Sequence, residues 1–197
     1  MNKESFSYRI VPAEKTDAGD IARGIATALH LGEPDAAIET SPEELTVWNR
    51  IFTELAEEDN SQYSYRNTYK AIDDEGKLLG IIISYDGAKL NELREAFFNK
   101  VEEVTGDRPG PFADETDESE WYLDSFAVWP EYRGLGIGRQ LLEAAKKEAR
   151  KAGKPAGLLV DKNNPKARKL YESVGFVYIG DRPFIDVMMD HLQTPSI

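Results

Sequence analysis

Three glycines occupy alternate positions in residues 133–139, whose sequence is Arg-Gly-Leu-Gly-Ile-Gly-Arg. Glycines at this density let the backbone turn sharply and approach a ligand without a Cβ atom in the way. A predicted strand precedes the segment and a predicted helix follows it, so unpaired amides and the positive end of the helix dipole meet there. Such a turn is suited to bind phosphate or pyrophosphate, with charged hydrogen bonds from Arg133 and Arg139.

Two common phosphate-binding motifs do not fit this turn. A P-loop ends in Gly-Lys-Ser or Gly-Lys-Thr, whereas Gly138 is followed by Arg139 and Gln140. The dinucleotide-binding fingerprint needs a further glycine and a later acidic residue, and the spacing here differs from it. On spacing alone, a purely structural turn stays open as the alternative.

The pattern of apolar residues predicts the elements that position this turn. Apolar alternation and turn residues predict strands over residues 6–11, 69–73, 78–85, 121–128, 157–160, 176–179 and 185–191. Helical spacing and capping residues predict helices over residues 17–30, 41–55, 89–103, 138–152 and 164–175. We interpret residues 86–120 as a helical and acidic insertion between two sheet strands, within a single domain spanning residues 1–197.

Two blocks of this sequence resemble a known family. Residues 121–138, with Arg133, Gly136 and Gly138 matching Arg/Gln-x-x-Gly-x-Gly/Ala, resemble motif A of the GNAT superfamily of N-acetyltransferases. Residues 164–176, Asn-x-x-Ala-x-x-Leu-Tyr-Glu-x-x-Gly-Phe, resemble motif B at the expected distance. The resemblance implies an α/β (α+β) fold: a mixed central sheet of six to seven strands, flanked by helices, with two strands splayed to hold the cofactor.

The resemblance also implies a reaction, the transfer of an acetyl group from acetyl-CoA to a primary amine by direct attack. The pantetheine arm would pair with the strand before the turn, and the pyrophosphate would bind the amides of the turn. Asn164 would contact the cofactor arm, although capping the following helix needs the same side chain. The implied cofactor-binding residues are Phe126, Ala127, Val128, Arg133, Gly134, Leu135, Gly136, Ile137, Gly138, Arg139, Asn164 and Tyr171.

The family's acid corresponds to Tyr171, whose phenol would protonate the departing thiolate, while the Val128 N–H would stabilise the oxyanion. Core packing is the alternative for Tyr171. The resemblance makes Asp124 the candidate base, with Tyr122 ordering a water; fixing a loop or binding the substrate ammonium is an equal alternative for Asp124. Strand alternation places Tyr122, Asp124 and Phe126 on one face of the sheet.

Composition bounds the partners. The formal net charge of −12 disfavours nucleic acid as a partner. The absence of cysteine excludes a cysteine nucleophile and a cysteine-ligated metal site. We expect a cytoplasmic protein without a membrane segment or a metal site, since His30 and His191 lack metal-site spacing. The acidic residues 114–120 are interpreted as a solvated loop, or as a screen for cationic substrates.

The acceptor stays open as a small molecule, an amino acid or a peptide, and a homodimer is compatible with the sequence. Two other functions also stay open: a non-catalytic acyl-CoA-binding module, and transfer of a longer acyl chain.

Overall fold

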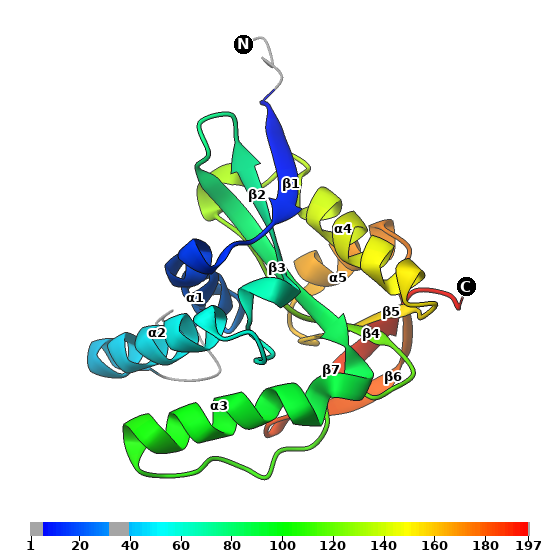
Figure 1. The fold of residues 1–197 in the computed structure, drawn as a ribbon. Helices are drawn as coiled ribbons and strands as arrows, with labels where there is room; N and C mark the ends of the chain where they lie inside the picture. The colour runs from blue at the N-terminus through cyan, green and yellow to red at the C-terminus, as the bar shows by residue number, and fades with distance from the viewer. Residues whose placement is uncertain (1–5, 32–39, 197) are drawn as a thin grey trace.

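Seven strands form one mixed sheet in this computed structural model, which describes residues 6–31 and 40–196 (Figure 1). The strands are β1 (Tyr8–Pro12), β2 (Thr68–Asp73), β3 (Leu78–Asp86), β4 (Trp121–Val128), β5 (Ala156–Val160), β6 (Val177–Phe184) and β7 (Val187–Gln193). Their order is β1-β2-β3-β4-β5-β7-β6, and of these neighbouring pairs β4 and β5 run parallel while the others run antiparallel. The predicted mixed sheet is confirmed.

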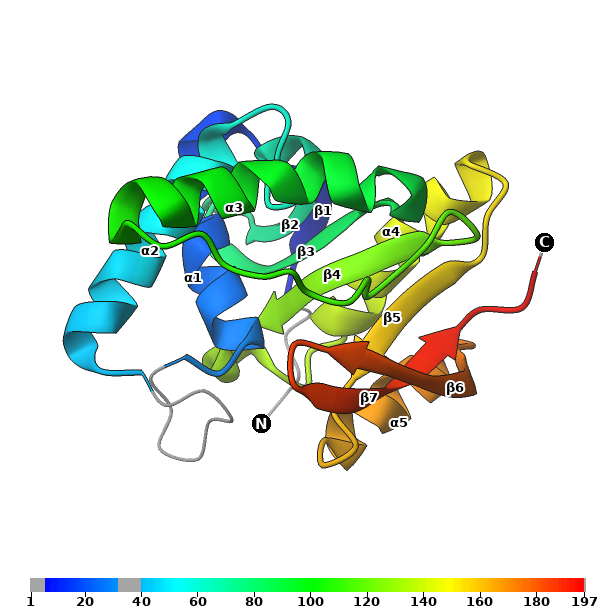
Figure 2. The ribbon, with the colours of Figure 1, turned by 90° about the horizontal axis from the view of Figure 1, so that it is seen from below.

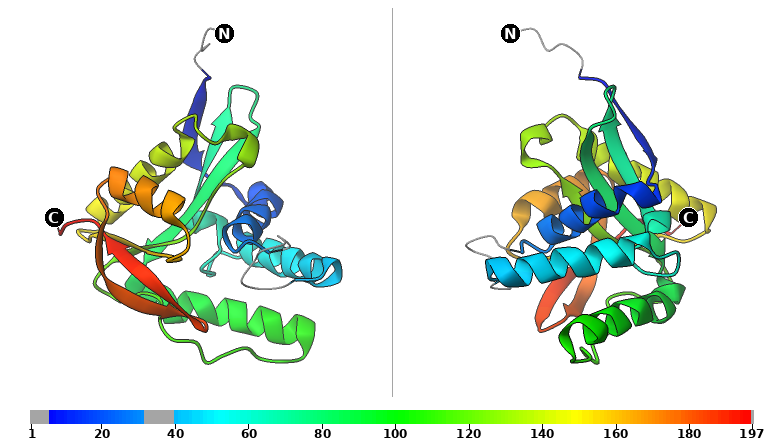
Figure 3. Two further views of the ribbon diagram at one scale, coloured as in Figure 1. Left: turned by 180° about the vertical axis from the view of Figure 1, so that it is seen from behind. Right: turned by 60° about the vertical axis from the view of Figure 1, so that its left-hand side comes forward.

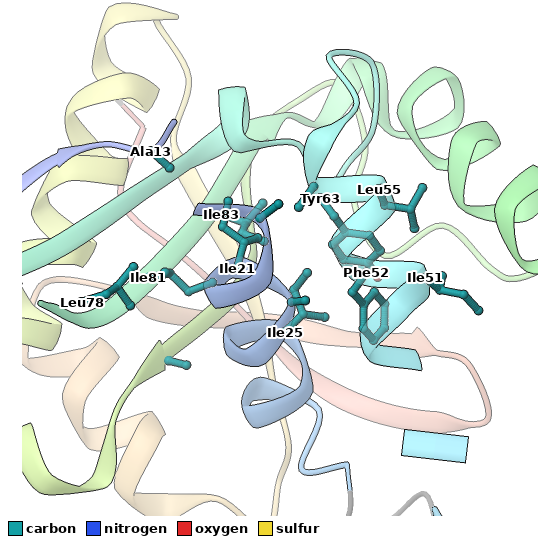
Figure 4. Close-up of a cluster of buried hydrophobic side chains, with 14 of the residues drawn as sticks. Ala13, Ile21, Ile25, Ile51, Phe52, Leu55, Tyr63, Leu78, Ile81 and Ile83 are labelled. Atoms are coloured by element: carbon teal, nitrogen blue, oxygen red, sulfur yellow. The ribbon is translucent and has the colours of Figure 1, made fainter. Parts of the chain in front are cut away.

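Helices cover both faces of this sheet (Figure 3). They are α1 (Ala18–Ala28), α2 (Pro42–Glu57), α3 (Leu90–Thr105), α4 (Ile137–Lys151) and α5 (Pro165–Ser173). On one face, Ile21 and Ile25 of α1 pack with Phe52 of α2 against Ile81 and Ile83 of β3 (Figure 4). On the other face, apolar residues of α4 and α5 pack against β3, β4 and β5. No helix among the described residues is both long and apolar enough to cross a bilayer.

Residues 87–120, which we call the β3–β4 connection, leave the sheet after β3 and return to it at β4. They form α3 and then a segment, residues 106–120, that runs back beside the helix without regular structure (Figure 2). The buried side chain of Arg94 in α3 holds this returning segment, because it donates to the carbonyl of Ala113 (3.3 Å) and pairs with Asp114. Phe98 packs on Phe112 with ring centroids 5.8 Å apart.

The end of the chain departs from the sequence prediction. Residues 180–184 were expected to connect two strands, but they belong to β6, and the turn falls at Ile185 and Asp186. Ile185 adopts a φ of 51° in this turn. Pro183 lies within β6, which is the last strand of the sheet, and an edge strand tolerates proline because one of its sides has no partner strand.

Candidate active site

The two parallel strands β4 and β5 separate soon after they meet. They pair only from Trp121 to Leu123 on β4 and from Ala156 to Leu158 on β5, although β4 continues to Val128. The splay that the resemblance implies is therefore present. It opens a pocket of about 100 Å³ lined by Ala28, Leu123, Asp124, Phe126, Leu142, Leu158, Leu159 and Tyr171.

A β-bulge in β4 sets which side chains face this pocket. Ser125 pairs with Ile83 and Leu123 pairs with Ser84, so Asp124 lies between them without a partner on β3. The extra residue reverses the alternation beyond it. Phe126 consequently packs with the α4 and α5 cluster, whereas Tyr122 lies on the α1 and α3 face against Tyr85. The prediction that Tyr122, Asp124 and Phe126 share one face was wrong for Phe126.

The register of β4 also decides which of its backbone groups face the gap. The N–H of Trp129 donates to Leu79 of β3 (2.9 Å). Because successive residues of a strand direct their backbone groups to opposite edges, those of Val128 and Phe126 point away from β3, toward the gap. Those of Ala127 point to β3, so the structure does not bring all three predicted backbone positions to the gap.

The glycine-rich turn follows at the end of β4 and begins α4. Gly134 and Gly136 adopt φ values of 81° and 84°, a region that residues with a Cβ seldom enter. The first backbone bond of α4 runs from the N–H of Gln140 to the carbonyl of Gly136 (3.3 Å). The amides of residues 134–139 donate no hydrogen bond within the described part of the chain. This cluster of free donors fits a pyrophosphate group.

The third glycine is required for a different reason. A Cβ atom at Gly138 would lie 3.0 Å from Cζ of Phe126, a strand residue that borders the pocket. The start of α4 therefore packs directly on the wall of the gap. Phe126 thus connects the wall of the pocket to the end of the glycine-rich turn.

The two arginines flank the turn and are tethered. Nε of Arg133 donates to the carbonyl of Val128 (3.0 Å), and Arg139 donates to the carbonyl (3.3 Å) and hydroxyl (3.1 Å) of Ser173 in α5. Both side chains remain exposed beside the free amides. They can add positive charge to the same anion site.

Tyr171 is placed where an acid could act. Its ring packs between Phe126 and Phe176, with centroid distances of 6.2 Å and 6.1 Å, and it lines the pocket. Its hydroxyl makes no hydrogen bond to a described residue. Burial raises the pKa of Tyr171 to about 12, so the phenol keeps its proton at neutral pH.

Asn164 caps α5, since its Oδ1 accepts a hydrogen bond from the N–H of Ala167 (3.0 Å). This is the structural alternative considered for Asn164, and it leaves the cofactor contact as a prediction.

Asp124 reaches from the pocket to a polar cluster on the α1 and α3 face. It accepts hydrogen bonds from the hydroxyl of Tyr85 (2.8 Å), the hydroxyl of Ser125 (2.9 Å) and Nε2 of Gln62 (3.3 Å). Burial raises the pKa of Asp124, and these three donors oppose the rise by stabilising the carboxylate. Tyr122 is buried beside this cluster, and desolvation raises the pKa of its phenol well above the usual value.

The sequence did not single out Glu115, which comes from the β3–β4 connection. Its side chain is buried, its Oε2 lies 3.9 Å from Nη1 of Arg94, and its charge interacts with that of Asp124. Burial, and then the charge of Asp124, raise the pKa of Glu115 to about 8. One acid within a run of acids carries no distinguishing signal, so only the fold reveals its position.

Among the other acids of residues 114–120, Asp114, Asp117 and Glu120 have specific partners, so the interpretation as a solvated loop was wrong for these positions. Asp117 pairs with Arg182 (2.7 Å). Glu120 is fully buried, with Oε2 lying 2.9 Å from Nε2 of His191 and accepting from Gln193 at 2.9 Å. His191 thus has a structural partner.

Comparisons with known proteins agree with this geometry. A sequence profile of the Acetyltransferase (GNAT) family matches residues 38–176. The crystal structure of an acetyltransferase is similar, with 29% identity and a TM-score of 0.75, over 96% of this chain and 100% of that one. An N-acetyltransferase from Staphylococcus aureus Mu50 shares the fold, with 24% identity and a TM-score of 0.78, over 94% and 100% of the two chains. None of the curated proteins matches the chain in sequence.

The splayed sheet, its pocket and the glycine-rich turn define an acyltransferase. More closely, the chain belongs to the Acetyltransferase (GNAT) family, whose members use acetyl-CoA as the acetyl donor.

Proposed function

We propose that this protein transfers the acetyl group of acetyl-CoA to a primary amine of a small molecule, an amino acid or a peptide. One observation carries the proposal: Asp124 and Tyr171, a candidate proton acceptor and a candidate proton donor, line the same pocket. Phe126 of that pocket also packs against Gly138 at the start of α4, where the free amides of the turn lie.

Different groups of the chain bind different parts of acetyl-CoA. The amides of residues 134–139, with Arg133 and Arg139, hold the pyrophosphate. The backbone groups of Phe126 and Val128 hold the pantetheine arm as an added strand would be held. Acetyl-CoA supplies the thioester that the amine attacks.

Proton movements then follow from the positions of three groups. Asp124 removes one proton from the substrate ammonium, and the neutral amine forms the new C–N bond at the thioester carbonyl. The N–H of Val128 stabilises the negative charge that develops on the carbonyl oxygen. As the C–S bond breaks, Tyr171 gives its proton to the thiolate. The new amide nitrogen still carries one extra proton, which passes through solvent to the Tyr171 phenolate, and Asp124 releases its own proton to solvent.

An assay of thiol release tests this function. Ethylamine, 2-phenylethylamine and the dipeptide Ala-Ala serve as acceptors, and mass spectrometry identifies the acetylated product. We expect thiol release that depends on the amine and yields one acetyl adduct per thiol. Binding of acetyl-CoA without turnover on any amine would instead support the non-catalytic acyl-CoA-binding module.

A further inference from the structure

We propose that Glu115 joins Asp124 and Gln62 in binding the ammonium group of the acceptor, and so selects cationic primary amines. This inference rests on the proposed function and deepens it. Glu115 acts through the position of the amine, so it is a positioning residue, whereas Asp124 exchanges the proton.

An unpaired acceptor marks the place where the amine would bind. Gln62 is only 4% exposed, and its amide is directed at Asp124 because Nε2 donates to Oδ2 of that residue (3.3 Å). Its Oε1 is buried and accepts no hydrogen bond within the described residues. A buried carbonyl oxygen without a donor costs free energy, which a ligand N–H would recover.

The charges around this acceptor are unbalanced in favour of a cation. Two carboxylates, Asp124 and Glu115, share the cluster with one guanidinium, that of Arg94. Arg94 already pairs with Asp114 and donates to Asn91 at 2.8 Å. Its nearest nitrogen to Glu115 lies 3.9 Å away, beyond hydrogen-bond distance. The two carboxylates therefore carry more negative charge than this guanidinium balances, and some of their oxygens can still accept hydrogen bonds.

A primary ammonium fits these acceptors. It carries three donors, and Asp124, Glu115 and the Oε1 of Gln62 offer three acceptors. Asp124 also lines the pocket between β4 and β5, so an amine held here lies beside the proposed acetyl position. Secondary amines have one donor fewer and would leave one acceptor unpaired.

Burial favours the protonated form of Glu115 in this cluster. Three hydrogen bonds favour the charged form of Asp124, whereas Glu115 receives none from the described residues, and burial raises the pKa of Glu115 to about 8. A bound ammonium lowers the pKa of Glu115 and releases that proton. The titratable and charged groups facing Glu115 are Tyr63, Tyr85, Arg94, Asp114, Tyr122 and Asp124.

The test compares Glu115→Gln with Glu118→Gln, an exposed acid three residues away in the same segment. We expect Glu115→Gln to raise the KM for 2-phenylethylamine about tenfold or more, since a charged hydrogen bond is lost, with the KM for acetyl-CoA unchanged. Glu118→Gln should leave both KM values unchanged. Equal amine KM values in the two variants, with the wild type active, would overturn the inference and leave the proposed function standing.

A binding measurement separates the two proposals further. Calorimetric titration of 2-phenylethylamine into the protein with coenzyme A, in two buffers of different ionisation enthalpy, reports protons released on binding. The wild type should release protons near pH 7, and Glu115→Gln should release none. Glu115→Asp retains the carboxyl group and should restore part of the release if the Gln variant folds poorly. Amine binding without proton release in the wild type, or no amine binding at all, would overturn the inference.

Discussion

Burial acts differently on the two groups that the proposed reaction requires to move protons. For Tyr171, whose hydroxyl has no hydrogen-bond partner among the described residues, burial raises the pKa to about 12, so the phenol is protonated at neutral pH. For Asp124, burial raises the pKa toward the range of a useful base while three hydrogen bonds keep the carboxylate oriented. The surroundings therefore support an acid and a base in one pocket.

Replacing Tyr171 with Phe should lower kcat about a hundredfold and leave the affinity for acetyl-CoA nearly intact, since only the proton donor is removed. Tyr69→Phe is the matched control, because its hydroxyl bonds to Glu148 (2.7 Å), a residue of α4 that does not line the pocket. Steady-state thiol release gives kcat, and calorimetry gives the affinity. An unchanged kcat in Tyr171→Phe would remove this residue from the mechanism.

The raised pKa of Glu115 makes stability depend on pH. The carboxyl group ionises near pH 4.5 in the unfolded chain but near pH 8 in the folded one, so the folded state binds more protons between these values. Its stabilising contribution is complete below about pH 4.5 and is lost as pH rises through about 8.

Glu115→Gln should therefore flatten the decline of the unfolding free energy between about pH 5 and 8.5, by up to about 1.4 kcal/mol per pH unit. Urea unfolding of the wild type and of Glu118→Gln across this range provides the comparison. Parallel profiles for wild type and Glu115→Gln would show that Glu115 is not buried as a neutral acid.

The sequence predicted the glycine-rich turn correctly but did not predict the bulge in β4, the strand before it. The turn was predictable because its glycines, arginines and flanking elements are contiguous, so local chemistry decides them. The bulge at Asp124 was not, because a strand with one extra residue still reads as an alternating strand until its pairing with β3 is known. Gln62 approaches Asp124 from a segment distant in the chain, and Glu115 approaches it from the irregular part of the β3–β4 connection, so no local pattern encodes that meeting.

Gly136→Glu should abolish acetyl-CoA binding, by about a hundredfold or more in Kd, because the side chain fills the turn and repels the pyrophosphate. Gly153→Glu is the control, since Gly153 adopts a φ of 68° at the other end of α4. Both variants carry the strain of a left-handed residue, about 1–2 kcal/mol. If the two variants bind acetyl-CoA equally, the turn does not hold the pyrophosphate.

At the scale of the whole molecule, the β3–β4 connection links the polar cluster around Asp124 to β7, on the other half of the sheet. Glu120, at its end, bonds to His191 and Gln193 of β7 and to Thr116 (2.7 Å). Its carboxylate lies over Gly157 of β5, where a Cβ atom would fall 1.7 Å from Oε2. Glycine at position 157 therefore lets β5, β7 and the end of the β3–β4 connection pack together.

Gly157→Ala should lower the free energy of unfolding by about 2–3 kcal/mol, because the carboxylate must leave partners that are fully buried. Gly19→Ala, in α1 with open space around its Cβ position, should be neutral or slightly stabilising. Urea denaturation measures both. Equal stability in the two variants would mean that Glu120 moves aside at no cost.

The central claim is that the gap between β4 and β5, together with the turn at residues 133–139, binds acetyl-CoA. Calorimetric titration of the folded wild-type protein with acetyl-CoA tests it most directly. We expect saturable binding of one molecule per chain. No association at millimolar acetyl-CoA would contradict it.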